Sequence, residues 1–346
     1  MSYDINELLT MACEANASDL HVTIGAPPIV RLHGSLKQYG SEALRPEHVH
    51  AMAKTLIPES QWNLFIEKGE LDFSYGIPNV SRFRLNVYHQ RSHIGIVARV
   101  IPSTIPSLEQ LQMPSLLKDL VEKPQGLILV TGPTGSGKST TLAAMIDYVN
   151  QRDSKHIVTL EDPIEYLHKH SRSIINQREI GFDTQSFSTG LRAALRQDPD
   201  IILVGEMRDL ETISTAITAA ETGHLVLATL HTSSAPQTID RIIDVFPPHQ
   251  QPQIRIQLAS VLVGIISQRL FPTRSGKGRV AATEILINQP SVANLIRSEK
   301  NHQIKSIMQT SKAQGMHTLE MSMKQLYQQG EIDMDIVKPY LEAGEW

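Results

Sequence analysis

The sequence predicts an α/β protein in two parts, a small mixed α+β domain followed by a larger domain built on a parallel sheet. In the first hundred residues, short helical patterns mix with alternating strands. Beyond residue 116, apolar runs alternate with amphipathic helices, which is typical of a parallel sheet covered on both faces. The first apolar run leads into G-x-x-x-x-G-K-S at residues 132–139, a phosphate-binding pattern. A length of 346 residues suits two or three domains.

The composition excludes several classes of protein. Hydrophobic residues make up 41% and charged residues 20%, so bulk disorder is not expected. A net charge of −4 gives no global sign of a nucleic-acid binder. The single Cys13 excludes an internal disulfide and a cysteine-clustered zinc site. Without a signal-like start or an apolar run near ~20 residues, we expect a soluble, cytoplasmic protein whose membrane contact is indirect.

The first predicted domain covers residues 1–100. Ile5, Leu8, Leu9 and Ala12 recur at helical spacing and predict a helix over 4–14. Glycine and prolines interrupt alternating residues over 19–30, which predicts short strands and a turn. Further patterns predict two helices and then two strands, at 47–56, 59–68, 81–88 and 93–100.

A linker is expected over residues 101–115. Pro102, Pro106 and Pro114 lie in this stretch. Each proline lacks an N–H group and restricts the preceding residue to extended conformations. The second domain should then occupy 116–346, with a mostly helical region from about residue 290.

Four short apolar runs predict the buried strands of the second domain, at 127–130, 157–160, 201–204 and 225–230. Amphipathic helices are expected between them, over 140–149 and 210–220. This alternation predicts a parallel sheet with helices on both sides.

The phosphate-binding loop has the strand and helix that its function requires on either side. Gly132, Gly135 and Gly137 allow a sharp turn, so that successive N–H groups face an anion. The positive end of the following helix adds to this nest. We expect Lys138 to reach the β and γ phosphates of ATP and Ser139 to bind Mg²⁺. The predicted nucleotide-binding residues here are Gly132, Pro133, Thr134, Gly135, Ser136, Gly137, Lys138, Ser139 and Thr140.

Acidic residues follow two of the predicted strands, where catalytic groups gather in such sheets. Glu161 and Asp162 follow one strand, with Glu165 close behind, and Glu206 follows another. A carboxylate there can hold Mg²⁺ through water or orient the attacking water. Glu206 and Glu161 are therefore candidates for catalysis and for the metal. Asp162 has a second interpretation, as the residue that caps a turn before a proline.

Two histidines flank the strand at 225–230. His231 follows the strand, at the end where a γ-phosphate would lie, whereas His224 precedes it. Both are candidates for the nucleotide site. The alternative for each is a structural hydrogen bond at the edge of the sheet.

Three arginines in the first domain form a further candidate group. Arg82 and Arg84 share one face of their strand because they are two residues apart, and Arg99 lies on the polar face of the next strand. Phosphoryl transfer benefits from an arginine supplied by a neighbouring subunit, which a ring would permit. The alternative is a solvated, charged face.

Taken in order, these motifs resemble the type IV pilus retraction ATPases, the PilT family within the secretion-ATPase superfamily. The resemblance runs almost from end to end. The matching segments are ASDLH at 17–21, GAPP at 25–28, RFR at 82–84, the phosphate loop, LEDPIEY at 160–166, DPD at 198–200, GEMRD at 205–209, TGH at 222–224 and LHT at 230–232.

The resemblance implies a PAS-like first domain, a RecA-like ATPase domain and a homohexameric ring with nucleotide at its subunit boundaries. It further implies that Asp162, Glu165 and His224 belong to the nucleotide site. The implied activity is ATP hydrolysis that drives pilus retraction and twitching motility through an inner-membrane platform protein. A paralogous pilus ATPase is another implied partner, and the ring would be peripheral to the cytoplasmic face of the membrane. No nucleic-acid partner is expected.

One segment departs from the family pattern. SVANLIR at 291–297 is similar to the C-terminal retraction motif A-I-R-N-L-I-R-E, but Val292, Ala293 and Ser298 replace its isoleucine, first arginine and final glutamate. The departure suits a retraction paralogue or an accessory retraction motor. Other interpretations are an assembly, secretion or DNA-uptake ATPase of the same superfamily, a RecA-like nucleic-acid translocase, and a nucleotide-binding regulator with little turnover.

Overall fold

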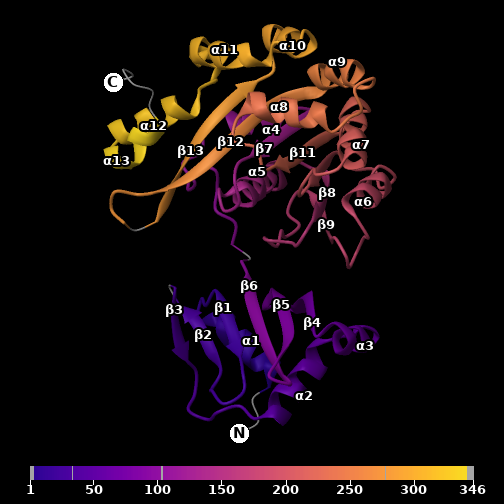
Figure 1. Ribbon diagram of the computed structural model, residues 1–346, viewed down its shortest axis with the longest axis vertical. Coiled ribbons are helices and arrows are strands. Elements are labelled where there is room, and N and C mark those ends of the chain that lie inside the picture. Colours follow the sequence, from indigo (N-terminus) through magenta and orange to yellow (C-terminus); the bar gives the residue numbers. More distant parts are fainter. Residues whose placement is uncertain (1–3, 33, 103, 277, 341–346) are drawn as a thin grey trace. The chain divides into compact units, whose positions relative to one another are not determined.

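The computed structural model describes residues 4–32, 34–102, 104–276 and 278–340 (Figure 1). These residues form two compact units. The first comprises Met1–Thr104 together with Pro163–Leu167, and the second comprises Ile105–Asp162 together with His168–Trp346. The grouping of 163–167 with the first unit is not apparent from the sequence, because this segment lies between two strands of the second.

The first unit is an antiparallel sheet with helices, in the strand order β3-β2-β1-β6-β5-β4. The predicted helices and the last two strands are confirmed, whereas β3 and β4 are additions. All four residues of β3 are exposed, so β3 carries no inside–outside alternation that sequence patterns could detect. The elements are α1 (Ile5–Glu14), β1 (Asp19–Val22), β2 (Ile29–Leu32), β3 (Ser35–Gln38), α2 (Pro46–Leu56), α3 (Glu59–Lys68), β4 (Glu70–Ile77), β5 (Ser81–Gln90) and β6 (His93–Ile101).

Alternation along β5 separates the core of the first unit from its polar face. Phe83, Leu85 and Val87 are fully buried. Arg82 and Arg84 point to the opposite face of the sheet, because successive side chains of a strand alternate. The predicted common face of these two arginines is confirmed.

The second unit has a seven-stranded sheet in the order β13-β12-β7-β11-β10-β8-β9, parallel except for the β12–β13 pair. The four predicted strands are β7, β8, β10 and β11, and the two predicted helices are α5 and α7. The elements up to the last strand are α4 (Leu116–Val121), β7 (Gly126–Thr131), α5 (Lys138–Arg152), β8 (His156–Glu161), β9 (Ile174–Glu179), α6 (Phe187–Ala194), β10 (Ile201–Val204), α7 (Leu210–Glu221), β11 (Leu225–Leu230), α8 (Ala235–Asp244), α9 (Gln251–Val261), β12 (Leu262–Pro272) and β13 (Arg279–Ile287).

Helices cover both faces of this sheet, as the sequence predicts. One apolar cluster joins α4 and α5 to the sheet, and another joins α7, α8 and α9 to its other face (Figure 1). Strand β12 was not predicted. Helix α9 ends at Val261 and β12 begins at Leu262, with no glycine, proline or polar turn to mark the change.

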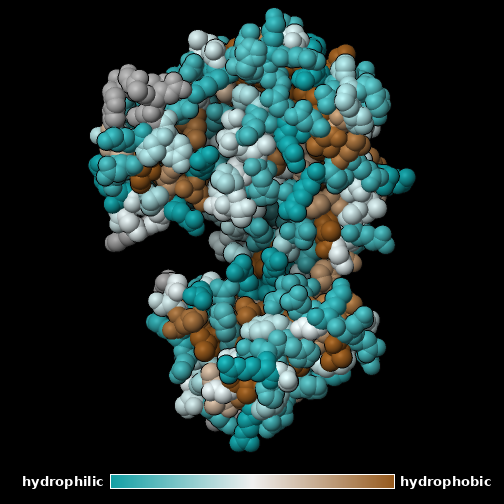
Figure 2. All heavy atoms as spheres, viewed as in Figure 1, coloured by the Kyte–Doolittle hydropathy of each residue, from teal (hydrophilic) through white to brown (hydrophobic). Residues whose placement is uncertain are grey.

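The remainder of the second unit is helical, which confirms the predicted tail. Its helices are α10 (Pro290–Arg297), η1 (Asn301–Gln303), α11 (Ile304–Thr310), η2 (Lys312–Gln314), α12 (Leu319–Gln328), α13 (Met334–Val337) and η3 (Lys338–Tyr340). Hydrophilic residues cover most of the face seen in Figure 2. Within the described ranges, no helix is both long and apolar enough to span a bilayer.

Candidate nucleotide-binding site

The loop between β7 and α5 has a backbone that only glycine accommodates at two points. Gly132 has a φ of 144°, and a Cβ on it would lie 2.3 Å from the carbonyl oxygen of Gln268. Gly137 has a φ of 88° and precedes the first residue of α5, Lys138. Both positions lie in the left-handed region, where other residues are strained. The glycines predicted to shape the loop therefore do so.

Strand β12 braces this loop from the adjacent position in the sheet. The side-chain amide of Gln268 donates to the carbonyl oxygen of Ser136 over 2.7 Å, and Gln268 is 2% exposed. One residue earlier, the hydroxyls of Ser267 and Thr131 lie 2.8 Å apart. Sequence analysis missed Gln268 because it lies more than 130 residues from the loop and carries no motif of its own.

Lys138 is nearly buried within the loop that it follows. Its Nζ donates to the carbonyl oxygens of Gly132 and Pro133 at 2.8 and 3.1 Å, and lies 3.5 Å from Nδ1 of His231. The lysine is 9% exposed. An ammonium group held at the mouth of an amide nest is suited to bind phosphate oxygens.

Glu206 is fixed through its neighbours on both sides. The amide of Gly205 donates to Leu160 on β8, and the amide of Met207 donates to Thr229 on β11. The carboxylate Oε1 lies 3.1 Å from Nε2 of His231 and 2.6 Å from Nε of Arg208.

Burial alone would raise the pKa of Glu206, but Arg208 and His231 outweigh it, so that the pKa is lowered overall. A lowered pKa keeps the carboxylate ionised, as a general base or metal ligand requires. Lys138, His231, Glu206 and Arg208 thus form one continuous polar chain across the carboxyl ends of β7, β11 and β10. Sequence analysis did not single out Arg208, although it lies in the same loop as Glu206.

Glu161 ends β8, one strand further from the phosphate loop than Glu206. Its Oε1 accepts hydrogen bonds from Thr159 Oγ1 at 2.6 Å and from Gln177 Nε2 at 3.0 Å. The main cause of the raised pKa of Arg208 is the hydrogen bond that it donates to Glu206. Asp162 follows Glu161 in the chain, and its charge adds a smaller contribution in the same direction. Both acids therefore lie at the predicted edge of the sheet, but with different neighbours.

The oxygen donors at this edge fit Mg²⁺. Ser139 in the first turn of α5, Glu206 and Glu161 offer hydroxyl and carboxylate oxygens, which hard divalent cations prefer. Mg²⁺ is commonly bound by one or two carboxylates, water and substrate phosphates. The bound ion would neutralise phosphate charge.

A cavity of about 240 Å³ adjoins the loop in the second unit. It is bordered by Gly137 and Thr140 of the loop and by Gln268, Leu270 and Arg279 of the β12–β13 hairpin. This cavity was not predicted, because its walls come from segments far apart in sequence. Its mixed apolar and polar lining suits a planar organic ring attached to a phosphate chain.

Two groups of predicted residues lie elsewhere. His224 precedes β11 and therefore lies at the amino ends of the parallel strands, opposite the phosphate loop. Its Nδ1 lies 3.0 Å from the carbonyl oxygen of Ala219. The six residues of β11 separate it from His231 by about 20 Å. Glu165 belongs to the segment 163–167, which groups with the first unit. Arg82, Arg84 and Arg99 lie in the main part of that unit.

Arg99 forms an ion pair within the first unit. Its Nε lies 3.1 Å from Oδ1 of Asp19, and Arg31 approaches the other oxygen of the same carboxylate at 3.7 Å. Arg84 is opposite Arg99 in the β5–β6 register. Four charged residues, Arg31, Asp19, Arg99 and Arg84, therefore occupy neighbouring register positions across β2, β1, β6 and β5.

Comparison with known proteins places the whole chain in one family. The family model described as type II/IV secretion system protein matches residues 1–338. The type IV pilus retraction ATPase PilT of Pseudomonas aeruginosa is 49% identical over 332 residues, covering 96% of each chain. The type IV pilus ATPase PilU of the same organism is 43% identical, over 95% of this chain and 86% of its own.

A solved structure agrees with these matches. The crystal structure of the pilus retraction motor PilT with bound ADP has a TM-score of 0.90 and 48% identity, and the match covers 99% of this chain and 98% of that one. At this similarity the architecture is that of the secretion ATPases, with a PAS-like first part and a RecA-like second part, as the family resemblance implied. The chain belongs to the type II/IV secretion system family and, within it, to the PilT family of pilus retraction ATPases.

Proposed function

We propose that this chain binds ATP with Mg²⁺ at the loop of residues 132–140, hydrolyses it, and uses the energy in a homohexameric ring to retract type IV pili. The observation that carries the proposal is the polar chain from Lys138 through His231 to Glu206, which starts in a phosphate-binding loop. A lysine for the phosphates and an ionised carboxylate for the attacking water are the groups that P-loop hydrolysis needs.

Each group at the sheet edge has a separate role in this proposal. Main-chain amides of the loop hold the triphosphate and Lys138 binds its outer phosphates, while Ser139 holds the metal. Glu206 accepts a proton from the attacking water, and His231 stands between it and the γ-phosphate. Glu161 acts on the metal through water. Hydrolysis adds water to the γ-phosphoryl group, giving ADP, phosphate and a proton.

The arginines of the first unit are proposed to act on the nucleotide of a neighbouring subunit. Arg84 is the best candidate because it is exposed, whereas Arg99 is engaged by Asp19. Arg82 shares the strand face of Arg84. An arginine supplied from a neighbour would stabilise the charge that develops during phosphoryl transfer. Asp162, Glu165 and His224 are proposed to contact nucleotide in the assembled ring.

The division of the chain and its partners complete the proposal. We assign residues 1–100 to a PAS-like domain, 101–115 to a linker and 116–346 to the ATPase domain, with the helical region beginning near 290. The ring would act at the cytoplasmic face of the inner membrane through a platform protein, and a paralogous pilus ATPase would assist it.

Steady-state phosphate release tests the enzymatic part. Wild-type protein should hydrolyse ATP with Mg²⁺, and Lys138→Ala should abolish both turnover and tight nucleotide binding. Lys155→Ala is the control, because that lysine pairs with Asp200 at the amino ends of β8 and β10, opposite the phosphate loop. Absence of phosphate release by the wild type at any protein concentration would leave only a nucleotide-binding regulator. Stimulation by single-stranded DNA that falls steeply with salt would favour a translocase instead.

Trans action is tested by mixing subunits. Arg84→Ala should reduce turnover without weakening nucleotide binding, because Arg84 lies outside the phosphate loop. Mixing Arg84→Ala with Lys138→Ala subunits should restore part of the activity, since some boundaries then combine an intact loop with an intact arginine. No recovery at any mixing ratio would contradict the assignment.

Deletion in cells tests retraction. Loss of this chain should leave surplus pili and abolish twitching, whereas loss of an assembly ATPase would leave cells without pili. An accessory role is the second candidate, because Val292 and Ala293 differ from the family motif and are buried on α10. An accessory motor would support retraction only while a second retraction ATPase is present, which a double deletion would reveal.

A further inference from the structure

A buried carboxylate outside the nucleotide site holds the amino end of a helix. Glu284 lies on β13 and is 6% exposed. Its Oε1 accepts a hydrogen bond of 2.7 Å from the amide of Ala235, the first residue of α8. The amide of Leu319, the first residue of α12, is near enough to lower the pKa of the same carboxyl group. Glu284 therefore receives the initial amide of α8, where the helix dipole favours an anion.

The first of these helices begins beside the nucleotide site. His231 precedes Ala235 by four residues, and the turn between them is held by hydrogen bonds of its own. Ser233 N donates to Gln237 Oε1 over 3.0 Å, and the hydroxyls of Thr232 and Thr238 lie 2.7 Å apart. Because this turn is tied to α8, the position of the helix determines where the imidazole of His231 meets Glu206.

The far half of α8 is tied to the C-terminal helices as well. Asp240 Oδ1 accepts a hydrogen bond of 2.7 Å from Asn301, which is 4% exposed and begins η1 immediately after α10. Helix α8 is thus held at its start by Glu284 of β13 and further along by the segment after α10 through Asp240.

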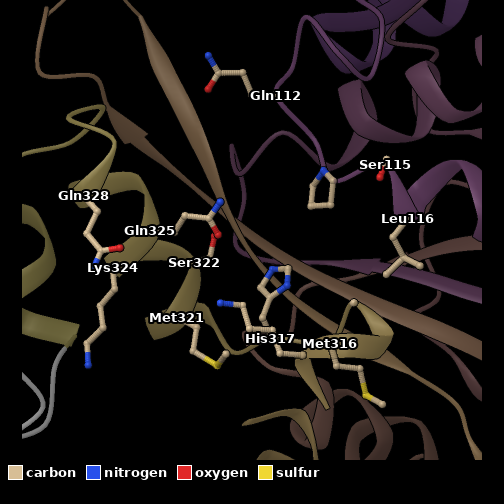
Figure 3. A pocket seen from close by; sticks show the side chains of 13 residues that line it. Gln112, Ser115, Leu116, Met316, His317, Met321, Ser322, Lys324, Gln325 and Gln328 are labelled. Atoms are coloured by element: carbon tan, nitrogen blue, oxygen red, sulfur yellow. The ribbon is translucent and has the colours of Figure 1, made fainter. Parts of the chain in front are cut away.

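Strand β13 is also connected to α12. The amide of Thr283 donates to Ser322 Oγ over 3.1 Å, and Thr283 Oγ1 lies 2.9 Å from Nε2 of His317. Figure 3 shows His317 and Ser322 beside a cavity of about 610 Å³, which lies between α12 and the segment around Gln112. In the β12–β13 register Glu284 is opposite Ser267, whose hydroxyl meets Thr131 just before the phosphate loop.

A purely structural reason does not account for a carboxylate at this position. Burial raises the pKa of Glu284, and the amides of Ala235 and Leu319 only partly oppose it, while Glu320 raises it further. A buried acid is costly unless its hydrogen bonds are needed, and well-packed apolar residues often stabilise as well or better. The feature that an apolar residue could not supply is an acceptor for the first amide of α8.

We propose that Glu284 is a positioning residue for ATP hydrolysis: it holds the start of α8 so that His231 meets Glu206, and the neighbouring Thr283 on the same strand joins β13 to α12. The inference rests on the proposed ATP hydrolysis. It assigns no contact between Glu284 and nucleotide, so nucleotide binding should not depend on it.

A double-mutant cycle tests the proposal in the full-length protein. The variants are Glu284→Ala, Glu284→Gln, His231→Ala and the combinations with His231→Ala. Glu320→Gln is the matched control, since that acid lies in the first turn of α12 and pairs with Lys305. Glu284→Ala should lower kcat about tenfold and leave the affinity for a non-hydrolysable ATP analogue within about twofold. Glu284→Gln keeps an acceptor oxygen, so its kcat should lie between those of wild type and Glu284→Ala. The kcat of Glu320→Gln should remain close to that of wild type.

The cycle separates positioning from a general loss of stability. If Glu284 acts through His231, adding Glu284→Ala to His231→Ala should reduce kcat by less than about twofold. A full tenfold further loss would overturn the proposal, and so would unchanged kcat in a folded Glu284→Ala protein. If that variant does not fold, the Glu284→Gln cycle decides by the same criterion. Wild-type turnover and its loss in Lys138→Ala test the underlying ATP hydrolysis separately.

Discussion

The carboxyl ends of β8 and β10 carry glutamates in neighbouring positions of one sheet, yet the two sites are built differently. Glu161 is held by the neutral side chains of Thr159 and Gln177. Glu206 is held by two basic side chains, His231 and Arg208. Parallel strands bring both acids to the same end of the sheet, and Glu206 connects through His231 to the lysine of the phosphate loop.

This difference indicates different tasks. Hydrogen bonds fix the orientation of both carboxylates, and the basic partners of Glu206 also lower its pKa. The side chain of Arg208 is 75% exposed, so a ligand can displace its contact with Glu206 at little cost, since exposed ion pairs contribute little. Glu206 is therefore suited to change partners during turnover and Glu161 to keep them.

The largest expected effect comes from removing the charge of Glu206. Glu206→Gln should bind ATP normally and lower kcat by at least about 100-fold, because the amide cannot accept a proton from water. Phosphate release and analogue binding, measured together, check this. Glu211→Gln is the matched control, since Glu211 of α7 forms an exposed ion pair with Arg192 of α6. Near-normal turnover in Glu206→Gln would reverse the comparison and make Glu161 the candidate base.

A smaller loss is expected at the other carboxylate. Glu161→Gln should lower kcat about tenfold, and raising the Mg²⁺ concentration should recover part of it, because the amide binds the metal less well. Titration of activity with Mg²⁺ measures both effects. A loss as large as that of Glu206→Gln, without any Mg²⁺ dependence, would mean that the two acids share one task.

Replacing Arg208 tests the comparison through the pH dependence of kcat/KM. Burial raises the pKa of Glu206, while Arg208 and His231 lower it, so that removing Arg208 should raise it. A general base is active when deprotonated, and its activity is lost as pH falls through its pKa. The acid limb of the kcat/KM profile should therefore move to higher pH in Arg208→Ala, with a severalfold loss confined to acidic pH. An unmoved or lowered acid limb would contradict this electrostatic role.

The smallest effect on turnover is expected at His168, which contacts Gln177, a partner of Glu161. The amide of His168 donates a hydrogen bond to the side chain of Gln177. Burial lowers the pKa of the His168 imidazole to about 4. Below its ordinary pKa near 6.5, His168 is protonated in the unfolded chain but not in the folded one, so stability falls as pH falls. Between pH 7 and about 5.5 this amounts to about 1 kcal/mol.

His168→Gln should remove that part of the pH dependence and leave turnover at neutral pH nearly unchanged. Urea unfolding at several pH values measures it, with His249→Gln as the control, since that histidine is exposed. Parallel stability curves for wild type and His168→Gln would rule out this source of acid sensitivity.

Local patterns predicted the phosphate loop and the central strands, because a motif in its required strand–loop–helix setting determines its own geometry. They did not find Gln268 or the cavity beside Arg279, since these depend on how β12 and β13 pair with distant segments. Arg208 lies two residues after Glu206, which the sequence singled out, but an arginine in a polar loop carries no periodic signal. The roles of the two glutamates could not be separated either, as they depend on partners from other strands.

The position of β7 in the sheet has a consequence for biosynthesis. This strand is complete by Thr131, yet it lies between β11 and β12, both of which are translated later. A nascent chain that has not reached residue 268 lacks the amide that holds Ser136, and one edge of its phosphate-loop strand remains unpaired. Unpaired strand edges invite association with other chains. Ribosome-bound intermediates should therefore acquire nucleotide binding only late in synthesis, after passing through a stage at which bound chaperones would protect this edge.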